Sequence, residues 1–287
     1  MNPPQEIEAA SLFSERDLHF SANDFRKIRD LIYQRAGIVL AEHKKDMVYS
    51  RVGRLVRARG LTRFGDYLAG LEASGKGEEW QTFVNALTTN LTSFFRESHH
   101  FPILADHVRG RRDPVRVWSA AASTGEEPYS IAMTLLETLG EHVNVEVLAT
   151  DIDTEALDRA RRAVYPLEQV ARLDDQRRRR FFQKGSGART GYARVKPSLA
   201  GKVRFQVMNL VGRDWPTGQR FDAIFCRNVM IYFDRETQSR VLGRLADRLK
   251  PDGLLFAGHS ENVAYLSDRF RSRGQTVYSL AGHDGGG

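Results

Sequence analysis

The sequence predicts an α/β fold with a doubly wound, mostly parallel sheet, preceded by a small all-α region. From residue 115 onward, short β-rich runs alternate with amphipathic helical segments, a pattern typical of β-α-β units. Residues up to about 90 carry helical spacing only. Of the 287 residues, 41% are hydrophobic and 28% are charged, so the chain can bury one large core or two modest ones.

The segment from Val115 to Asp151 is the most informative part of the chain. It predicts a strand over 115–119, a turn of small residues over 120–125, a helix over 126–139 and a second strand over 145–149. Such a turn lets a ligand approach the backbone, and an acidic residue after the second strand can bind ribose hydroxyls. This favours a nucleoside half-site. The alternative is an alanine-rich turn that only precedes a helix, as in many α/β domains.

The composition of that turn argues against a dinucleotide. A dinucleotide site needs three glycines, whereas only Gly125 is present, and Glu126 and Glu127 follow it in the first helical turn. Two carboxylates there would repel a pyrophosphate but would suit a ligand with a positive centre and no phosphate, such as S-adenosylmethionine. The alternative is that both glutamates only stabilise the start of the helix.

The rest of the sheet follows from later apolar runs. Strands are predicted over 203–208, 221–226, 254–257 and 276–280, with the last of them antiparallel, and a helix over 236–249 that Lys250-Pro-Asp-Gly253 ends. Residues 166–202 form a polar, basic insertion. Polar side chains follow several strands, at the edge where open sheets bind ligands: Asp151, Asn209, Arg227, Asn228 and His259.

The first 90 residues predict several amphipathic helices, one of them strongly basic. A helix over 24–36 has Ser21 or Asn23 as its N-cap and ends at Gly37. Between His43 and Gly60, six basic residues stand against one acidic residue, while apolar residues recur at helical spacing. The basic face either binds an acidic partner or is a solvated surface.

Charge and composition limit the class of protein. A net charge of +7 and a pI near 9.6 imply an acidic partner. No apolar run is long enough to span a bilayer and no signal-peptide pattern is present, so we expect a cytoplasmic location. Cys226 is the only cysteine, and its apolar neighbours predict a buried, inert thiol. No metal site is expected, because His99 and His100 are adjacent and would diverge on a helix.

Five long, collinear motifs resemble the CheR-type chemotaxis receptor (glutamate) methyltransferase family. They are Thr88–Arg96, Ser119–Ser130, Ala149–Asp153, Phe221–Phe233 and Lys250–Asn262. The resemblance implies a doubly wound S-adenosylmethionine-dependent methyltransferase fold with an N-terminal all-α domain over 1–90 that faces the receptor. The methyltransferase domain would occupy 91–287, with an inserted β-subdomain over 166–202.

The resemblance also implies an activity and its partners. The methyl group of S-adenosylmethionine would pass to glutamate side chains in the cytoplasmic domains of chemoreceptors, giving methyl esters and S-adenosylhomocysteine. Neither nucleic acid nor membrane insertion is expected. Some family members also dock on a receptor's C-terminal pentapeptide through a glycine loop, which Gly185, Gly187 and Gly191 resemble and to which Arg189 belongs.

Site residues carry over by motif. The positions that match cofactor contacts of the family are Asn90, Thr92, Arg96, Glu127, Asp151, Asn209, Leu210, Arg227 and Asn228. Arg96 and Tyr232 are the candidates for a part in the chemistry, Arg96 by orienting the substrate carboxylate. The alternative is that Arg96 pairs only with the cofactor and Tyr232 only packs. Substrate-binding candidates on the basic helix are Arg51, Arg54, Arg57 and Arg59.

Two other classes of function compete with this one. A nucleic-acid methyltransferase would also be basic, but the chain has no Asn-Pro-Pro-Tyr or Asp-Pro-Pro-Tyr tetrapeptide, and Cys226 lies inside a predicted strand. A regulatory module that binds a nucleoside without catalysis is disfavoured by the intact Asp151, Arg96 and Asn228.

Overall fold

A computed structural model describes residues 18–75, 77–112, 114–216 and 218–282. The chain forms two compact units. The first holds the residues up to Leu31 together with Ala41–Leu87, and the second holds Ile32–Leu40 together with the chain from Thr88 onward. Among the described residues, none of the helices combines the length and the apolar composition that a membrane span requires.

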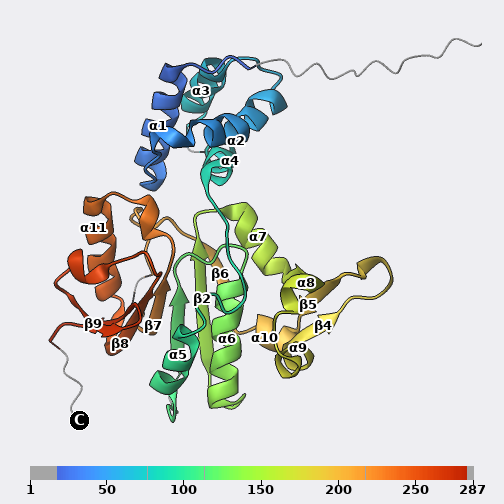
Figure 1. The fold of residues 1–287 in the computed structure, drawn as a ribbon, viewed down its shortest axis with the longest axis vertical. Helices are drawn as coiled ribbons and strands as arrows, with labels where there is room; N and C mark the ends of the chain where they lie inside the picture. The colour runs from blue at the N-terminus through green and yellow to red at the C-terminus, as the bar shows by residue number, and fades with distance from the viewer. Residues whose placement is uncertain (1–17, 76, 113, 217, 283–287) are drawn as a thin grey trace, which may run out of the picture. The chain divides into compact units, whose positions relative to one another are not determined.

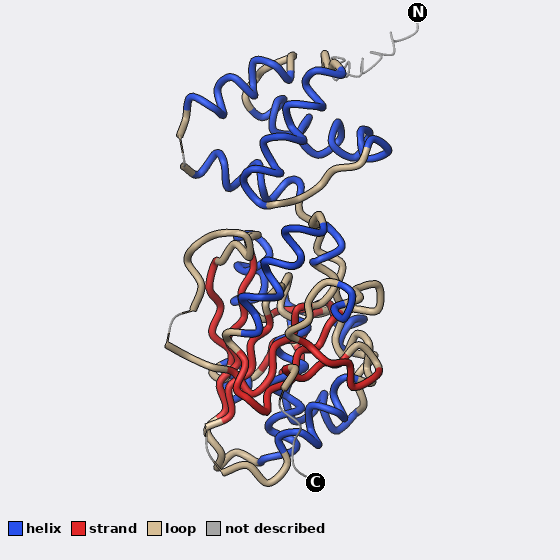
Figure 2. The backbone as a smooth tube through the Cα atoms, turned by 90° about the vertical axis from the view of Figure 1, so that its left-hand side faces the viewer, coloured by secondary structure: helices blue, strands red, loops and turns tan. Residues whose placement is uncertain are grey.

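The first unit is helical, as Figure 2 shows by its colouring. Its helices are α1 (Ala22–Ala36, whose last turn belongs to the second unit), η1 (Glu42–Lys44), α2 (Lys45–Ala58), α3 (Phe64–Ala73) and α4 (Glu78–Leu87). Ser21 is the cap of α1: its hydroxyl accepts from the Asp24 N–H, while the Asp24 carboxylate accepts from the Ser21 N–H at 2.8 Å. The apolar faces of these helices supply a buried core that includes Phe25, Val52 and Phe64.

The second unit contains a seven-stranded sheet in the order β6-β2-β1-β7-β8-β10-β9. The strands are β1 (Val115–Ser119), β2 (Val145–Asp151), β6 (Val203–Val207), β7 (Phe221–Cys226), β8 (Leu249–Ala257), β9 (Phe270–Gly274) and β10 (Val277–Leu280). The first five in spatial order are parallel, and β10 and β9 add an antiparallel edge. In register, Val117 of β1 lies between Val147 of β2 and Ala223 of β7.

Helices cover both faces of this sheet, which confirms the doubly wound α/β fold (Figure 1). On one face, α5 (His100–Val108) and α6 (Glu126–Leu139) pack on Val117 and Phe225, and α7 (Thr154–Arg162) packs over Ala149. On the other face, α11 (Arg235–Ala246) packs over Trp118 and Ile224. Alternate residues of β1 therefore enter opposite cores, as the two-residue period of a strand requires.

The end of the sheet differs from the sequence-based prediction. Lys250–Gly253 does not separate a helix from a strand but lies inside β8, where the register with β7 shifts between Phe221 and Ala223. The helix α11 already ends at Ala246. Strand β9 was not predicted, because its Arg271 and Arg273 interrupt the apolar pattern at an exposed sheet edge.

The basic insertion forms a separate three-stranded sheet in the order β3-β5-β4. Its strands are β3 (Val164–Pro166), β4 (Phe182–Lys184) and β5 (Tyr192–Val195), and its short helices are α8 (Leu167–Val170), α9 (Asp175–Phe181), η2 (Gly187–Arg189) and α10 (Pro197–Ala200). Both strand pairs are antiparallel. Phe182 and Val195 are buried in the same core cluster as α6 and the seven-stranded sheet, so the insertion shares the core of the second unit.

A buried carboxylate joins the amino ends of the strands. Asp222 on β7 is fully buried, and its carboxylate accepts from the Arg111 guanidinium and from the Arg116 N–H at 2.9 Å. Both of its oxygens also accept from Lys250 Nζ, at 2.9 and 3.0 Å. It therefore ties the entry into β1 to β7 and β8. The amino ends of the strands lie at the opposite edge of the sheet from their carboxyl ends, where the ligand is expected. We therefore assign this cluster to stability alone.

We predict that Asp222→Ala lowers the free energy of unfolding by about 3 kcal/mol, because two cations and one buried N–H lose their acceptor. Denaturant unfolding should show a lower midpoint with an unchanged slope. Asp247→Ala is the matched control. The Asp247 and Arg269 side chains of this ion pair are 59% and 45% exposed, so the pair should contribute less than about 1 kcal/mol to stability. Equal losses for both variants would contradict the assignment.

Candidate functional site

The carboxyl ends of four parallel strands carry the site. β1 ends at Ser119, β2 ends at Asp151, Arg227 follows β7, and Gly258 follows β8. The chain passes from β1 outward to β2 and β6 and then returns to β7 on the other side of β1. The gap between β1 and β7 is thus the topological switch point, where open α/β sheets bind their ligands.

The turn after β1 is not built to hold a phosphate. Four of its backbone N–H groups are used inside the protein: Ala120 donates to Phe225 O, Ala122 to Thr150 O, Gly125 to Ala122 O, and Ser123 to Asp151 Oδ2. Gly125 has φ +99°, and a β-carbon there would lie 2.7 Å from the Tyr165 hydroxyl and 2.8 Å from Ala160 Cβ. The glycine is therefore needed both for its left-handed backbone and for the close packing of this turn against Tyr165 and Ala160.

Asp151 and Asp153 organise the end of β2. The Asp151 carboxylate accepts from the Ser123 N–H at 2.7 Å and the Asp153 N–H at 2.9 Å. Burial raises the pKa of Asp151 to about 6. A carboxylate has about four acceptor positions, so Asp151 keeps capacity for ligand hydroxyls. Asp153 caps α7 and accepts from Thr88 Oγ1 and Asn90 Nδ2, both at 2.6 Å, which fastens the segment before α5 to this edge.

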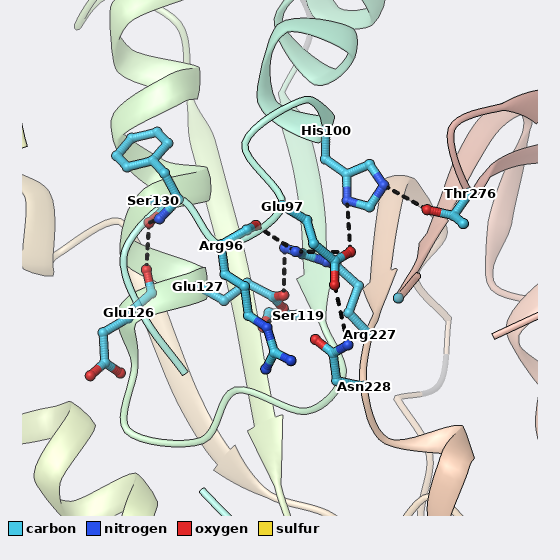
Figure 3. Close-up of polar contacts among 12 residues, drawn as sticks. Arg96, Glu97, His100, Ser119, Glu126, Glu127, Ser130, Arg227, Asn228 and Thr276 are labelled. Carbon is cyan, nitrogen blue, oxygen red and sulfur yellow. Dashed lines mark hydrogen bonds and ion pairs between the residues drawn. The ribbon is translucent and has the colours of Figure 1, made fainter. Parts of the chain in front are cut away.

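A buried ion cluster lies between β1 and β7 (Figure 3). The Arg227 guanidinium, whose side chain is 1% exposed, contacts Glu97 Oε2 at 3.2 Å and Glu127 Oε2 at 3.1 Å, and donates to the Arg96 carbonyl. Glu127 also accepts from Ser119 Oγ at 2.7 Å. Burial raises the pKa of Glu127, whereas Arg227 and the Asn228 amide hold the pKa of Glu97 below its usual value against the effect of burial.

The two glutamates that start α6 have different environments. Glu126 is buried and accepts from Thr124 Oγ1 at 2.7 Å, and burial raises its pKa. Its hydrogen-bond partner lies in the turn just before α6. Glu127 instead faces the ends of β1 and β7.

Arg96 lies on a strained turn. Its neighbours Phe95 and Glu97 both have φ +53°, a left-handed conformation that non-glycine residues rarely adopt. Its half-exposed side chain donates through Nη1 to the Leu91 carbonyl at 2.7 Å and points away from the Glu97 carboxylate in Figure 3. Thr92 is also half-exposed on this segment. A strained turn held by Arg227 thus presents Arg96 at the edge of the sheet.

The segment Ile32–Leu40 supports the remaining candidates. The Asn209 amide donates to the Arg35 carbonyl at 2.7 Å and its oxygen accepts from the Val211 N–H, so that side chain serves the backbone. Leu210 is buried in the core. Tyr232 lies in η3 (Met230–Tyr232), and its carbonyl accepts from the Val39 N–H at 2.8 Å. Sequence reasoning did not foresee a part for this segment, which is remote in the chain.

The substrate-binding candidates fall into two groups. Gly185, Gly187, Arg189 and Gly191 form the loop of the β4–β5 hairpin: Gly187 and Gly191 have φ +58° and +90°, and a β-carbon on Gly185 would lie 2.2 Å from the Arg189 carbonyl oxygen. On α2, Arg51 is half-buried and Arg54 and Arg57 are exposed, and Arg59, the C-cap residue of this helix, is exposed as well. Arg59 pairs with Glu79 at 2.5 Å, which lowers the pKa of that carboxyl.

Several residues of the site were not predicted. Glu97, Ser119, Ser123 and Asp153 bond directly to predicted residues. Only Asp153 carried a usable signal, since an acidic residue just before a helical run indicates an N-cap. Among the described residues, no three His, Cys, Asp or Glu side chains are grouped so that they could hold a metal ion.

Comparison with known protein families places the second unit among the methyltransferase domains that bind S-adenosylmethionine. The family described as "CheR methyltransferase, SAM binding domain" matches residues 90–279, and "CheR methyltransferase, all-alpha domain" matches residues 23–88. The chain belongs to the CheR methyltransferase family.

Three relatives show how far the similarity extends. The chemotaxis protein methyltransferases of Escherichia coli (strain K12) and Salmonella typhimurium (strain LT2) are each 57% identical to this chain, over 92% of it and 93% and 92% of their own lengths. Chemotaxis protein methyltransferase 2 of Pseudomonas aeruginosa is 51% identical, over 94% of this chain and 97% of its own. The similarity therefore includes both units.

We predict that Asp151→Asn weakens S-adenosylhomocysteine binding by about one to two orders of magnitude, because charge-assisted bonds to the ribose are lost. The wild-type affinity should also fall as the pH drops below about 6, because protonation removes the ionised acceptor; the variant should lack this dependence. Calorimetry at several pH values measures both. Unchanged affinity in a folded variant would show that Asp151 does not hold the ligand.

Proposed function

We propose that this protein transfers a methyl group from S-adenosylmethionine to glutamate side chains in the cytoplasmic domains of bacterial chemoreceptors. The products would be glutamate methyl esters and S-adenosylhomocysteine, and the process would be adaptation in chemotaxis. The observation that carries the proposal is the family match along both units, together with intact polar residues at the switch point.

The residues present fit the cofactor. S-adenosylmethionine supplies an activated methyl group on a positively charged sulfur. The absence of a phosphate cradle after β1, the open acceptor capacity of Asp151 and the carboxylate of Glu127 suit an adenosine with a cationic amino-acid tail. Leu210 would contribute apolar contact to the cofactor, and Asn209 and Arg227 would position their neighbours. The full set of residues proposed to hold the cofactor is Asn90, Thr92, Arg96, Glu127, Asp151, Asn209, Leu210, Arg227 and Asn228.

The chemistry needs little from the protein beyond positioning. A glutamate carboxylate has a reference pKa near 4.3, so it is ionised and nucleophilic at neutral pH without a general base. One carboxylate oxygen must be held about 3–3.5 Å from the methyl carbon, in line with the leaving sulfur. The carboxylate must also be orientated without being so strongly stabilised that it loses reactivity.

Arg96 is the residue we propose for that orientation. Its guanidinium is already held by the Leu91 carbonyl, which limits its rotation, and its backbone is held by Arg227. Tyr232 would line the same pocket from η3, where the Val39 N–H fixes its backbone. A planar guanidinium can pair with a carboxylate through two parallel bonds, which sets direction as well as distance.

The two units would have different functions. We propose that residues 1–90 form the receptor-facing domain, with the arginines of α2 opposite a glutamate-rich receptor surface, and that residues 91–287 form the methyltransferase domain. The insertion over 166–202 would dock on a receptor's C-terminal pentapeptide. The protein would work in the cytoplasm, where these receptor parts lie.

The proposed activity has a direct test. The protein is incubated with S-adenosylmethionine labelled in the methyl group and with receptor cytoplasmic domains. Label that enters the receptor and is released as methanol by mild base identifies a carboxyl methyl ester. Label that is stable to base, or that enters nucleic acid instead, would contradict the proposal.

We predict that Arg54→Glu combined with Arg57→Glu raises the KM for receptor about tenfold at low salt and leaves S-adenosylhomocysteine affinity unchanged, because surface charges act on association. The difference should shrink as salt is added. Arg109→Glu with Arg112→Glu is the control, since it makes the same charge change near the amino ends of the strands. If both double variants raise the KM for receptor equally, the effect comes from net charge and not from the position of the α2 arginines.

We predict that an isolated five-residue receptor tail with aromatic and acidic residues binds the hairpin at micromolar concentration, by adding to a strand edge. Gly185→Val should abolish this binding, because its side chain would collide with the Arg189 carbonyl. Methylation of a tailless receptor domain should not change. Gly243→Ala, where a β-carbon meets nothing within 4 Å, is the control. Failure of the wild type to bind in calorimetry would remove the docking function.

A further inference from the structure

Glu261 lies in the loop after β8 and is 4% exposed. Its carboxylate accepts four backbone N–H groups. Oε2 accepts from Gly258 at 2.6 Å and Asn228 at 3.0 Å, and Oε1 accepts from Val229 at 2.9 Å and Met230 at 2.8 Å. A carboxylate with this number of backbone donors is saturated, so it is not available as a proton acceptor for a substrate.

Three of those donors come from consecutive residues after β7. Asn228 has φ +57°, and Val229 has φ −122° and ψ −36°. A left-handed residue followed by such a residue turns successive N–H groups toward one point and forms a concave anion site, which in other proteins receives a phosphate or a carboxylate ligand. Here the protein fills it with its own side chain. The Asn228 conformation, unusual for a non-glycine residue, is therefore tied to the Glu261 carboxylate.

The loop after β8 is packed against this turn without spare room. A β-carbon on Gly258 would lie 2.5 Å from Asn228 Nδ2 and 2.9 Å from both the Asn228 nitrogen and Glu261 Oε2. Gly258 is thus required by close approach rather than by an unusual φ. Glu261 and Gly258 together fix the ends of two neighbouring strands to each other.

Two candidate site residues depend on this turn. The Asn228 side chain donates to Glu97 Oε1 at 3.2 Å (Figure 3), so Asn228 is held by Glu261 through its backbone and by Glu97 through its amide. The Met230 N–H, which Glu261 also binds, opens the short helix η3 that carries Tyr232. A shift of the turn would move both residues relative to Glu127 and Arg96.

We propose that Glu261 is a positioning residue of the cofactor site, which sets the place of Asn228 and Tyr232 by holding the turn after β7 in its left-handed conformation. The inference rests on the proposed function, since it takes Asn228 as a residue of the cofactor site. Glu261 itself touches neither reactant.

The test is Glu261→Gln, which keeps the shape and replaces one oxygen by an NH₂ group. In either amide orientation, that NH₂ faces two backbone donors that it cannot satisfy. We expect S-adenosylhomocysteine to bind at least tenfold more weakly in calorimetry, and the KM for S-adenosylmethionine to rise with little change in the KM for receptor. Glu236→Gln, on an exposed side chain of α11, is the matched control and should behave as wild type.

Asn228→Ala separates positioning from general stability. If Glu261 acts through the turn and its side chain, Glu261→Gln should weaken binding much less in the Asn228→Ala background than in wild type, because the group being positioned is already absent. Fully additive losses would overturn the proposal. A lower melting temperature with unchanged ligand affinity and unchanged KM, measured well below that temperature, would also overturn it.

Gly258→Ala covers the case in which Glu261→Gln does not fold. It presses on the same turn from the β8 side while leaving the Glu261 side chain chemically unchanged, so it should weaken S-adenosylhomocysteine binding in the same way. Normal binding by a folded Gly258→Ala protein would count against the proposal. Failure of the proposed function looks different, because the wild type itself would then either bind no S-adenosylhomocysteine or transfer no base-labile methyl label to receptor domains.

Discussion

The buried guanidinium of Arg227 is the contact on which the site depends. It joins three parts of the second unit: the end of β7, the Glu127 carboxylate that Ser119 connects to β1, and the turn that carries Arg96 and Glu97. Removing it would leave two buried carboxylates without their cation, at a cost of several kcal/mol. Arg227 therefore matters more as the centre of this cluster than as a surface for a ligand.

Around this cluster, the protein fixes irregular backbone with carboxylates instead of with regular structure. Asp151 holds the turn after β1, Asp153 holds the segment before α5, and Glu261 holds the turn after β7. Each binds backbone N–H groups or neutral side chains that a loop cannot pair by itself. Loops held in this way can present reactive side chains with little freedom, which is what a positioning enzyme requires.

The proposed reaction explains why so much of the site is support. A carboxylate substrate arrives ionised, and the methyl group arrives activated, so the chain is not asked for a nucleophile or a strong base. Cys226, the one thiol of the chain, is buried, and burial raises its pKa well above the usual value, which leaves it inert. What would remain for the protein in this reaction is to hold two ligands in line.

The sequence by itself determined the alternation of strands and helices, the helical first unit and the acidic end of β2, because these depend on local periodicity and on residues close in the chain. Tertiary structure decided which residues meet. The contacts between Arg227 and Glu127, between Asn209 and Arg35, and between Glu261 and Asn228 join residues that are 100, 174 and 33 positions apart. Nothing in local spacing encodes such pairs, since only the order of strands in the sheet brings their loops together.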